Sequence, residues 1–460
     1  MKTLVFPIVF LLFSNLILGQ SNVKFAMIGD YGKAGPNELA VSNLVKSWNP
    51  EFVITVGDNN YELGHQDTID MNIGQYYHEF IFPYIGSYGP GDTVNRFFPA
   101  LGNHDWNTSS ALPYLNYFTL PGNERYYDFI KGDIHFFVID SDNREPDGRD
   151  SNSIQGQWLK NKLAQSSQKW NIVYFHHPPY CSNVSTTIMR LPFKRWGATT
   201  VLAGHIHYYE RLNIDNFTYI VNGLGGRSRA SPGTPIPGSE LIYGADYGAM
   251  LINTYNDSLI LKFYTIAGVL IDNYKILPTA KSLTLTSFIE GFYNSNTNTM
   301  IGDTVIVYLI NTFTPYSIVD SAKGYLNSVG EGTFNFTSAN NATSYYLVIK
   351  HRNSIETWSA LGKSFAASLL IYNFTSASAQ AYGNNLVQVD NSPLRYAIYG
   401  GDVNQDGTIE AADLSAVDND AFNLVSGYLN TDLNGDNFVD ASDLSIVDNN
   451  AFGLVTVRRP

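Results

Sequence analysis

The chain contains very little cysteine. Cys181 is the only one among 460 residues, so no disulfide can form within the chain. Charged residues are also scarce, at 15%, whereas hydrophobic residues make up 44% and aromatic residues 14%. A chain of this length exceeds what one hydrophobic core can organise. We therefore expect two to four domains whose stability comes from large cores rather than from disulfides.

Long apolar runs are missing after the first twenty residues, and no later segment is apolar enough to span a bilayer. The start of the chain differs: Lys2 precedes the apolar run Leu4–Leu18, and the small residue Ser21 follows it. This pattern predicts a signal peptide over residues 1–20 and a secreted or cell-surface protein. A transmembrane anchor is the alternative, but the run is short and Pro7 interrupts it.

Positive charge is in deficit, with a formal net charge of -13. Residues 401–460 hold eleven acidic residues against two arginines, a net charge of -9, so most of the acidity lies there. This excludes nucleic acid as an expected partner. The rest of the chain has no strong field that would repel an anionic substrate.

Strand-like and helix-like stretches alternate between residues 23 and 277. The expected strands are Val23–Ile28, Phe52–Val56, Ile134–Ile139, Ile172–Phe175 and Thr200–Ala203, and the expected helices are Leu39–Trp48 and Gln157–Ala164. The alternation predicts an α/β fold, a layered β-sandwich with flanking helices. Gly248–Leu277 has the pattern of strands alone, which we expect to close the second sheet of this domain.

Residues 281–399 have a different composition, rich in Thr, Ser, Tyr and Asn, with alternating apolar segments and frequent turn signals. They predict a separate all-β module, an antiparallel β-sandwich. The module shows no convincing catalytic cluster. His351 and Arg352 are interpreted as ordinary polar residues at the end of a strand.

Five short motifs, each after a predicted strand, contain side chains that bind metals. They are Gly29-Asp30-Tyr31-Gly32, Gly57-Asp58-Asn59-Asn60-Tyr61, Gly102-Asn103-His104-Asp105, Phe175-His176-His177-Pro178 and Gly204-His205-Ile206-His207. Ligands in α/β sheets gather at the carboxyl ends of strands, so we expect these side chains to meet. Each motif alone is common, and the signal lies in five of them together.

The residue types suit two metal ions that share one carboxylate. The first set would be Asp30, Asp58, Tyr61 and His207, and the second would be Asp58, Asn103, His176 and His205. The first set is rich in anionic oxygen and suits a trivalent ion such as iron(III), whereas the second suits zinc, manganese or iron(II). Paired metals of this kind hydrolyse phosphate esters, so a small phosphate ester is the expected substrate.

The motifs resemble those of the purple acid phosphatase branch of the calcineurin-like metallophosphoesterases, from Val23 to Leu277. Many other members of that superfamily have Asp-x-His in the first block and no tyrosine after the second. Here Asp30 is followed by Tyr31 and Gly32, and Tyr61 is present. The resemblance implies the metallophosphoesterase fold, the seven ligands above, and an acid phosphatase that cleaves phosphate monoesters by attack of metal-bound hydroxide. It also implies that His104 binds phosphate or donates the proton.

One departure from that family leaves the general acid open. The family often has a further histidine after the fourth block, but none occurs between Pro178 and Gly204. His104, His177 or water can serve, and His177 can point away from the site. Two other functions also stay open: a phosphodiesterase or nucleotidase on the same fold, and a non-catalytic protein that binds a surface or scaffold.

An internal repeat with a period of thirty residues lies within 402–452, where Asp413–Phe422 matches Asp443–Phe452. Each copy follows a twelve-residue acidic loop whose positions 1, 3, 5, 7 and 12 are those that bind calcium in helix-flanked loops. The candidate ligands are Asp402, Asn404, Asp406, Thr408 and Asp413 in the first loop, and Asp432, Asn434, Asp436, Phe438 and Asp443 in the second. Position 7 would contribute its backbone carbonyl. Gly407 permits the sharp turn in the first loop, and Asn437 takes its place in the second.

These repeats, over residues 401–453, resemble a dockerin, which pairs two such calcium loops with helices. The resemblance implies bound calcium and a cohesin-like or cell-surface scaffold partner. A domain held together by calcium, without any partner, is the alternative.

Overall fold

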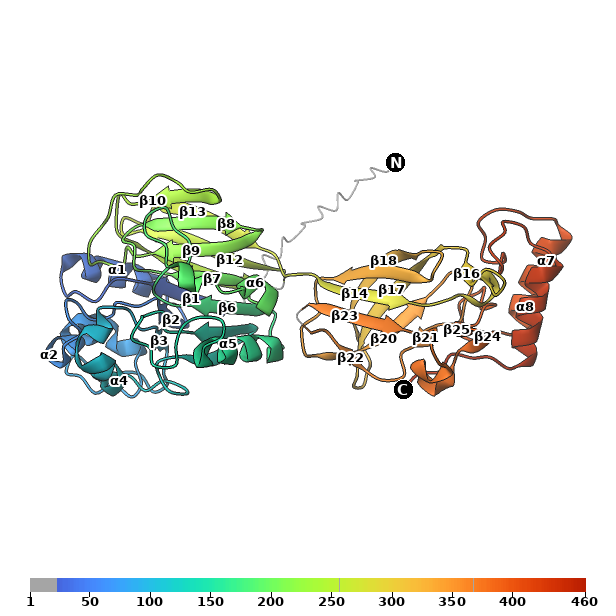
Figure 1. Ribbon diagram of the computed structural model, residues 1–460, viewed down its shortest axis with the longest axis horizontal. Helices are drawn as coiled ribbons and strands as arrows, with labels where there is room; N and C mark the ends of the chain where they lie inside the picture. Colours follow the sequence, from blue (N-terminus) through green and yellow to red (C-terminus); the bar gives the residue numbers. More distant parts are fainter. Residues whose placement is uncertain (1–22, 256, 367) are drawn as a thin grey trace, which may run out of the picture.

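The computed structural model describes residues 23–255, 257–366 and 368–460, so the predicted signal peptide lies outside the described residues. Figure 1 shows the strands up to Ile276 in one body and the later strands in a second, with helices α7 and α8 side by side beyond it. No helix in the described ranges has the length and hydropathy that crossing a bilayer requires.

The first sheet of the first body has six strands in the order β13-β12-β11-β1-β2-β3. Their bounds are β1 Val23–Ile28, β2 Phe52–Thr55, β3 Phe97–Pro99, β11 Gly248–Tyr255, β12 Ser258–Thr265 and β13 Leu270–Ile276. β1, β2 and β3 run parallel, and β11 pairs antiparallel with β1. β11 to β13 therefore extend the sheet of β1. The expectation that they close the second sheet is wrong, because β11 pairs with the edge of β1 that β2 does not use.

The second sheet has seven strands in the order β10-β8-β9-β7-β6-β5-β4. Their bounds are β4 Tyr127–Lys131, β5 Ile134–Val138, β6 Trp170–Tyr174, β7 Thr200–Ala203, β8 Tyr209–Ile214, β9 Phe217–Asn222 and β10 Ser239–Tyr243. β5, β6, β7 and β9 run parallel to one another. The carboxyl ends of these four strands therefore lie at one edge of the sheet.

Aromatic rings pack between the two sheets. Phe25 and Phe52 of the first sheet meet Phe136 of β5 edge to face, with ring centroids 5.2 and 5.5 Å apart. The next residue, Phe137, faces the other way and shares a buried cluster with Leu159 of helix α5. Because both faces of this sheet are apolar, helices cover the one that the first sheet does not. The predicted layered α/β fold is confirmed.

The helices of this body are short. They are α1 Pro36–Ser47, α2 Gln66–Ile69, α3 Gln75–Tyr77, α4 Leu112–Tyr117, α5 Ile154–Gln165 and α6 Phe193–Trp196. α1 begins three residues before the predicted Leu39 because Pro36 suits the first helical position. α5 likewise begins before the predicted Gln157, since Ser153 caps it by accepting a hydrogen bond from the Gly156 amide.

The second body is rich in β-structure. Its strands are β14 Lys281–Thr286, β15 Tyr293–Asn294, β16 Thr299–Met300, β17 Asp303–Asn311, β18 Ile318–Leu326, β19 Glu331–Phe336, β20 Ser344–Lys350, β21 Thr357–Trp358, β22 Lys363–Ser364, β23 Leu369–Asn373, β24 Val387–Asn391 and β25 Leu394–Ala397. A sheet ordered β19-β14-β23 and a sheet ordered β18-β17-β20-β21 contribute to one buried core. The expectation of purely antiparallel pairing is wrong at one place: β14 and β23 run parallel. The long intervening chain supplies the crossover that a parallel pair requires.

Two matched helices follow, α7 Ala411–Phe422 and α8 Ala441–Phe452. Both begin with a capping box, in which Asp413 and Asp443 at the third helical position accept from the backbone of the capping residue. They pack against the β-rich region, since Ile355 lies in one buried cluster with Val417 and Val447.

Candidate metal centre

The five motifs lie at neighbouring strand ends. Asp30, Asp58 and Asn103 follow β1, β2 and β3, whereas His176 and His205 follow β6 and β7 of the facing sheet. Asp30, Asp58 and His205 adopt the left-handed backbone region, with φ of 56°, 54° and 70°. Residues with a Cβ rarely adopt it, and such conformations gather at functional sites.

The first predicted ligand set converges around the Tyr61 hydroxyl. Tyr61 Oη donates to Asp58 Oδ2 at 2.8 Å and lies 3.1 Å from Asp30 Oδ1. His207 Nε2 lies 3.4 Å from the same hydroxyl and 3.2 Å from Asp30 Oδ1. His207 Nδ1 contacts Ser228 Oγ, so Nε2 is the nitrogen turned toward the carboxylates.

The second predicted set converges on His176 Nε2. Asn103 Oδ1 and His205 Nδ1 each lie 3.1 Å from it, and Asp58 Oδ2 lies 3.3 Å from it. The Val56 carbonyl lies 2.9 Å from His176 Nδ1 and so fixes which nitrogen faces the site. The same oxygen, Asp58 Oδ2, therefore contacts both sets.

The electrostatics of the centre fit a bound cation. Burial by itself would raise the pKa of Asp58, but His176 and His104 hold it well below its usual range. Burial lowers the pKa of His176, yet the carboxylates of Asp58 and Asp30 raise it to about 10. The buried carboxylates thus hold a proton on a histidine, and a metal ion would replace that proton as the compensating charge.

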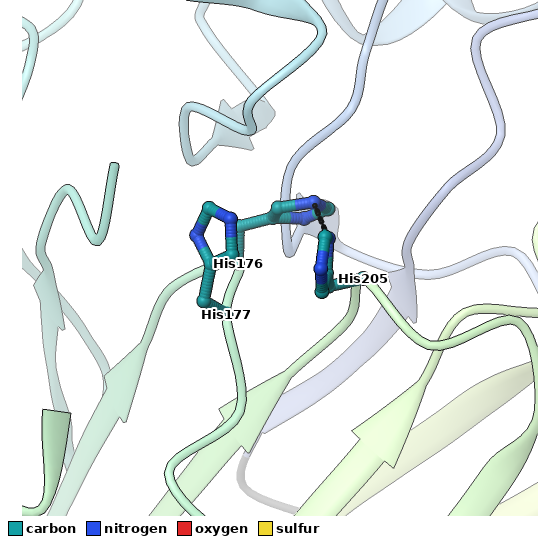
Figure 2. A group of neighbouring side chains, drawn as sticks. All are labelled: His176, His177 and His205. Atoms are coloured by element: carbon teal, nitrogen blue, oxygen red, sulfur yellow. Dashed lines mark hydrogen bonds between the residues drawn. The ribbon is translucent and has the colours of Figure 1, made fainter. Parts of the chain in front are cut away.

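Figure 2 shows His176, His177 and His205 together, and His177 does not point away from the others. Its ring centroid lies 4.4 Å from that of His205 and 4.9 Å from that of His176, and potential ligand atoms of the three lie within 4.8 Å of one another. Its Nδ1 lies 2.9 Å from Ser141 Oγ. Burial and the charges of His176 and His205 lower the pKa of His177 to about 2, so its imidazole is neutral.

His104 lies on the more open side of the centre. Its side chain is 29% exposed, and its Nε2 lies 3.8 Å from Asp58 Oδ2. The ring packs against Tyr61 with centroids 4.3 Å apart, and Nδ1 contacts the Glu62 carbonyl. His104 therefore lies between the candidate ligand Asp58 and solvent.

Asp105 has a supporting role that the sequence interpretation did not assign. Its carboxylate is buried and accepts from the amides of Gly102 at 2.9 Å and Asn59 at 3.1 Å, and from Asn59 Nδ2 at 2.8 Å. Burial and the nearby Asp58 raise its pKa to about 7. Asp105 therefore ties the loop of Asp58 to the loop of Asn103. The acidic residue at the end of the third motif is a signal that could have indicated this role.

Two glycines let these loops approach each other. A Cβ on Gly102 would lie 2.2 Å from the Asp58 amide nitrogen, and one on Gly57 would lie 2.7 Å from His176 Nδ1. Gly57 also has φ of +95°. No other residue type satisfies both the conformation and the close contact at Gly57.

The first acidic loop, around Asp402, has unmet bonding capacity. Asp402 Oδ1 is buried without a hydrogen-bond partner. Burial, together with Asp413 and Asp406, raises the Asp402 pKa to about 6. Asp413 Oδ1 accepts from the Val403 and Asn404 amides at 3.0 and 3.2 Å, which curls the loop inward. An orphaned carboxylate oxygen among other oxygen donors fits calcium.

The second loop repeats this geometry. Asp443 Oδ1 accepts from the Leu433 and Asn434 amides at 2.7 and 3.0 Å. At the turn position, Asn437 has φ of 69° and Gly407 of the first loop has φ of 91°, so asparagine does adopt the conformation expected of it. The structure thus gives the two sets of predicted calcium ligands the same loop form.

Other polar residues singled out in the sequence have structural surroundings. Cys181 is buried in the cluster beneath α5 and α6 and is a free thiol. His351 is buried, with Nε2 3.1 Å from Asp303 Oδ2, and Arg352 pairs with the same carboxylate.

Comparison with known proteins agrees with this geometry. Residues 23–209 match the family described as calcineurin-like phosphoesterase, and residues 400–450 match the dockerin type I domain. Purple acid phosphatase 23 of Arabidopsis thaliana is 26% identical over 249 residues, which is 44% of this chain and 52% of that protein. A purple acid phosphatase of Glycine max is also 26% identical, over 44% of this chain and 46% of its own length. The chain spans about half the length of the curated relatives it matches.

Two solved structures that superpose on part of this chain are of proteins 18% identical to it in sequence. One is a purple acid phosphatase from yellow lupin seeds, with a TM-score of 0.47 over 56% of this chain and 54% of that chain. The other is described as the anchor in the inner membrane complex of Plasmodium, with a TM-score of 0.47 over 56% and 90%. On the family matches and the purple acid phosphatase relatives, this chain carries a metallophosphoesterase domain of the calcineurin-like family, similar to purple acid phosphatases, followed by a dockerin type I domain.

Proposed function

We propose that the protein is a secreted acid phosphatase that hydrolyses phosphate monoesters at a binuclear metal centre. The observation that carries this proposal is the position of Asp58 Oδ2, 2.8 Å from Tyr61 Oη and 3.3 Å from His176 Nε2. In this proposal that one carboxylate joins the two sets of candidate ligands. Two bound metals supply a strong nucleophile from water at moderate pH and neutralise phosphoryl oxygens.

The two sets favour different ions. Asp30, Asp58, Tyr61 and His207 offer three oxygen ligands that can carry negative charge, which suits iron(III). Asn103, His176 and His205 add no charge to the shared carboxylate, which suits zinc, manganese or iron(II). In this proposal His104 orients the phosphate group and donates a proton to the leaving oxygen, while neutral His177 packs against His176 and His205 and keeps both rings in place.

The test is the visible spectrum of the purified protein measured together with its metal content. A broad tyrosinate-to-iron(III) band with two metals per chain, lost in Tyr61→Phe, supports the proposal. A colourless protein with two metals per chain makes it a zinc or manganese phosphoesterase in which Tyr61 is a neighbour of the site. Comparing p-nitrophenyl phosphate with its bis ester then decides between a monoesterase and a diesterase or nucleotidase.

The dockerin domain supports a second proposed function, calcium-dependent attachment to a cohesin-like protein on a scaffold or cell surface. The matched side chains Phe422 and Phe452 at the ends of α7 and α8 are 86% and 92% exposed, which leaves both available to a partner. Calorimetric titration with a cohesin domain, with and without calcium, tests this role. Attachment without turnover would favour a non-catalytic, scaffold-binding protein.

A further inference from the structure

The loop between β5 and α5 borders the histidine side of the metal centre. Ser141 Oγ accepts from the His177 amide at 2.9 Å and contacts His177 Nδ1 at 2.9 Å. Arg149 Nη1 in turn donates to the Ser141 carbonyl at 2.9 Å. The Arg149 guanidinium is therefore connected to His177 through a single residue, Ser141.

Two other arginines near the centre, Arg144 and Arg227, bind carboxylates. Arg144 forms a two-point pair with Asp142, with Nε–Oδ1 at 2.7 Å and Nη2–Oδ2 at 2.9 Å. Arg227 donates to both oxygens of Glu62 at 2.8 Å. Both guanidinium groups are therefore engaged by a carboxylate, and Glu62 also pairs with Lys33 at 2.7 Å.

Arg149 is different because it has no carboxylate within ion-pair distance in the described part of the chain. Its neighbour Asp150 is already engaged, since Asp150 Oδ1 accepts from the Asn152 amide at 2.8 Å and the Ser153 amide at 3.1 Å. Glu145 and Asp147 both bind Arg125 instead. Arg149 is thus left with an uncompensated positive charge beside the site.

The backbone just before Arg149 is held in place by Gln155. Gln155 Nε2 donates to the Gly148 carbonyl at 2.8 Å and to the Asp140 carbonyl at 2.9 Å. The backbone N–H of Gln155 donates to the Asp147 carbonyl at 3.3 Å. A cation on an anchored loop loses less conformational freedom when it binds a ligand.

We propose that Arg149 binds the leaving group of the substrate, and that the preferred substrates are phosphate monoesters whose leaving group carries a second phosphate. This inference rests on the proposed phosphatase function. Arg149 lies beyond His177, outside the candidate ligands, and the proposal places the second phosphate of the leaving group against it. A guanidinium offers two parallel N–H groups that match phosphate oxygens.

The experiment compares glucose 1,6-bisphosphate with glucose 6-phosphate, which differ by one phosphate. Arg149→Gln should raise KM for the bisphosphate about tenfold, as expected when a charged hydrogen bond is lost. It should change KM for the monophosphate less than about twofold and leave kcat unaltered for both. Arg149→Lys should recover part of the difference. Arg195→Gln, which removes the positive charge of an exposed side chain on α6, is the matched control and should have no effect.

An equal KM change for both sugars, or none for either, overturns the proposal. If the wild-type protein hydrolyses neither sugar, the phosphatase function fails, and calorimetric binding of glucose 1,6-bisphosphate to the zinc-loaded protein decides the role of Arg149. Weaker binding to Arg149→Gln than to wild type and Arg195→Gln supports the inference. Equal binding, or none to the wild type, refutes it. Unchanged melting temperatures show that the variants are folded.

Discussion

At the scale of single residues, Asp58 has the most demanding position. It is buried, has a left-handed backbone, and one of its oxygens contacts both Tyr61 and His176. Its Oδ1 also accepts from the His104 amide at 2.9 Å, which places the candidate proton donor. Few residue types could replace it, because both its charge and its two oxygens are used.

Asp58→Ala should therefore lose both metals and reduce kcat/KM at least about a thousandfold, since a metal contributes several kcal/mol to such a reaction. Metal content by elemental analysis and turnover of p-nitrophenyl phosphate measure this. Asp272→Ala removes a different buried carboxylate of the same body, one that binds Arg211, and should keep the metals. Full turnover by Asp58→Ala would show that the site is wrongly assigned.

Asp402 makes calcium binding depend on pH. Its folded-state pKa of about 6 lies above the ordinary 3.8. Its contribution to the stability of the calcium-free protein is thus full below pH 4 and is lost as pH rises through 6. Calcium requires the ionised carboxylate, so the affinity of the first loop should rise about tenfold from pH 5 to pH 7. Calorimetric titration at both pH values measures this rise, and Asp402→Asn should flatten it. Equal affinities in the wild type would contradict the assignment.

At the scale of elements, the site depends on how strands end. Gly57 and Gly102, in the loops that follow β2 and β3, permit backbone contacts that any side chain would block, and Asp105 then joins the two loops by hydrogen bonds. The strands themselves are ordinary apolar segments, and their role is to bring the following residues to one edge of each sheet.

Two glycine substitutions separate backbone strain from damage to the site. Gly57 and Gly268 both have left-handed φ, +95° and +76°, but an added Cβ meets the His176 ring at Gly57 and nothing within 4 Å at Gly268. Both alanine variants should lose about 1 kcal/mol of stability from strain. Only Gly57→Ala should also lose metal, as read from metal content beside melting temperature. Equal metal content in the two variants would show that His176 can shift without consequence.

At the scale of the whole molecule, the dockerin domain is packed onto the β-rich region. Asn353 Nδ2 donates to the Asp432 carbonyl at 2.7 Å, and Asn450 Nδ2 donates to Glu290 at 2.6 Å. Ile355 lies in the same buried cluster as residues of α7 and α8. The calcium loops therefore support an interface as well as their own helices.

Calcium removal should lower hydrogen-exchange protection in α7 and α8 and also in the β-rich region around Glu290 and Ile355, because the two parts share contacts. The first body, residues 23–276, should keep its protection, since none of the calcium-loop residues belongs to its buried clusters. Adding calcium back should restore the original pattern. Loss confined to residues 402–452 would mean that the interface survives without calcium.

The sequence alone predicted the features that depend on neighbouring residues. The five motifs indicated the candidate ligands, the repeat indicated the two calcium loops, and apolar stretches indicated most strands of the first body. These features were accessible because a strand, a turn at Gly407 or a twelve-residue loop is defined by local spacing and residue type.

Only the tertiary structure decided the pairing of β11 with β1, the parallel pairing of β14 with β23, the direction of His177 and the uncompensated charge of Arg149. Each depends on which distant segments pack together. A strand's pattern does not name its partner, and an arginine's sequence neighbours do not show which carboxylates are already engaged. The local sequence thus determined which side chains could bind a metal or calcium ion. The packing of distant segments determined where those side chains lie and which charged groups are left without a partner.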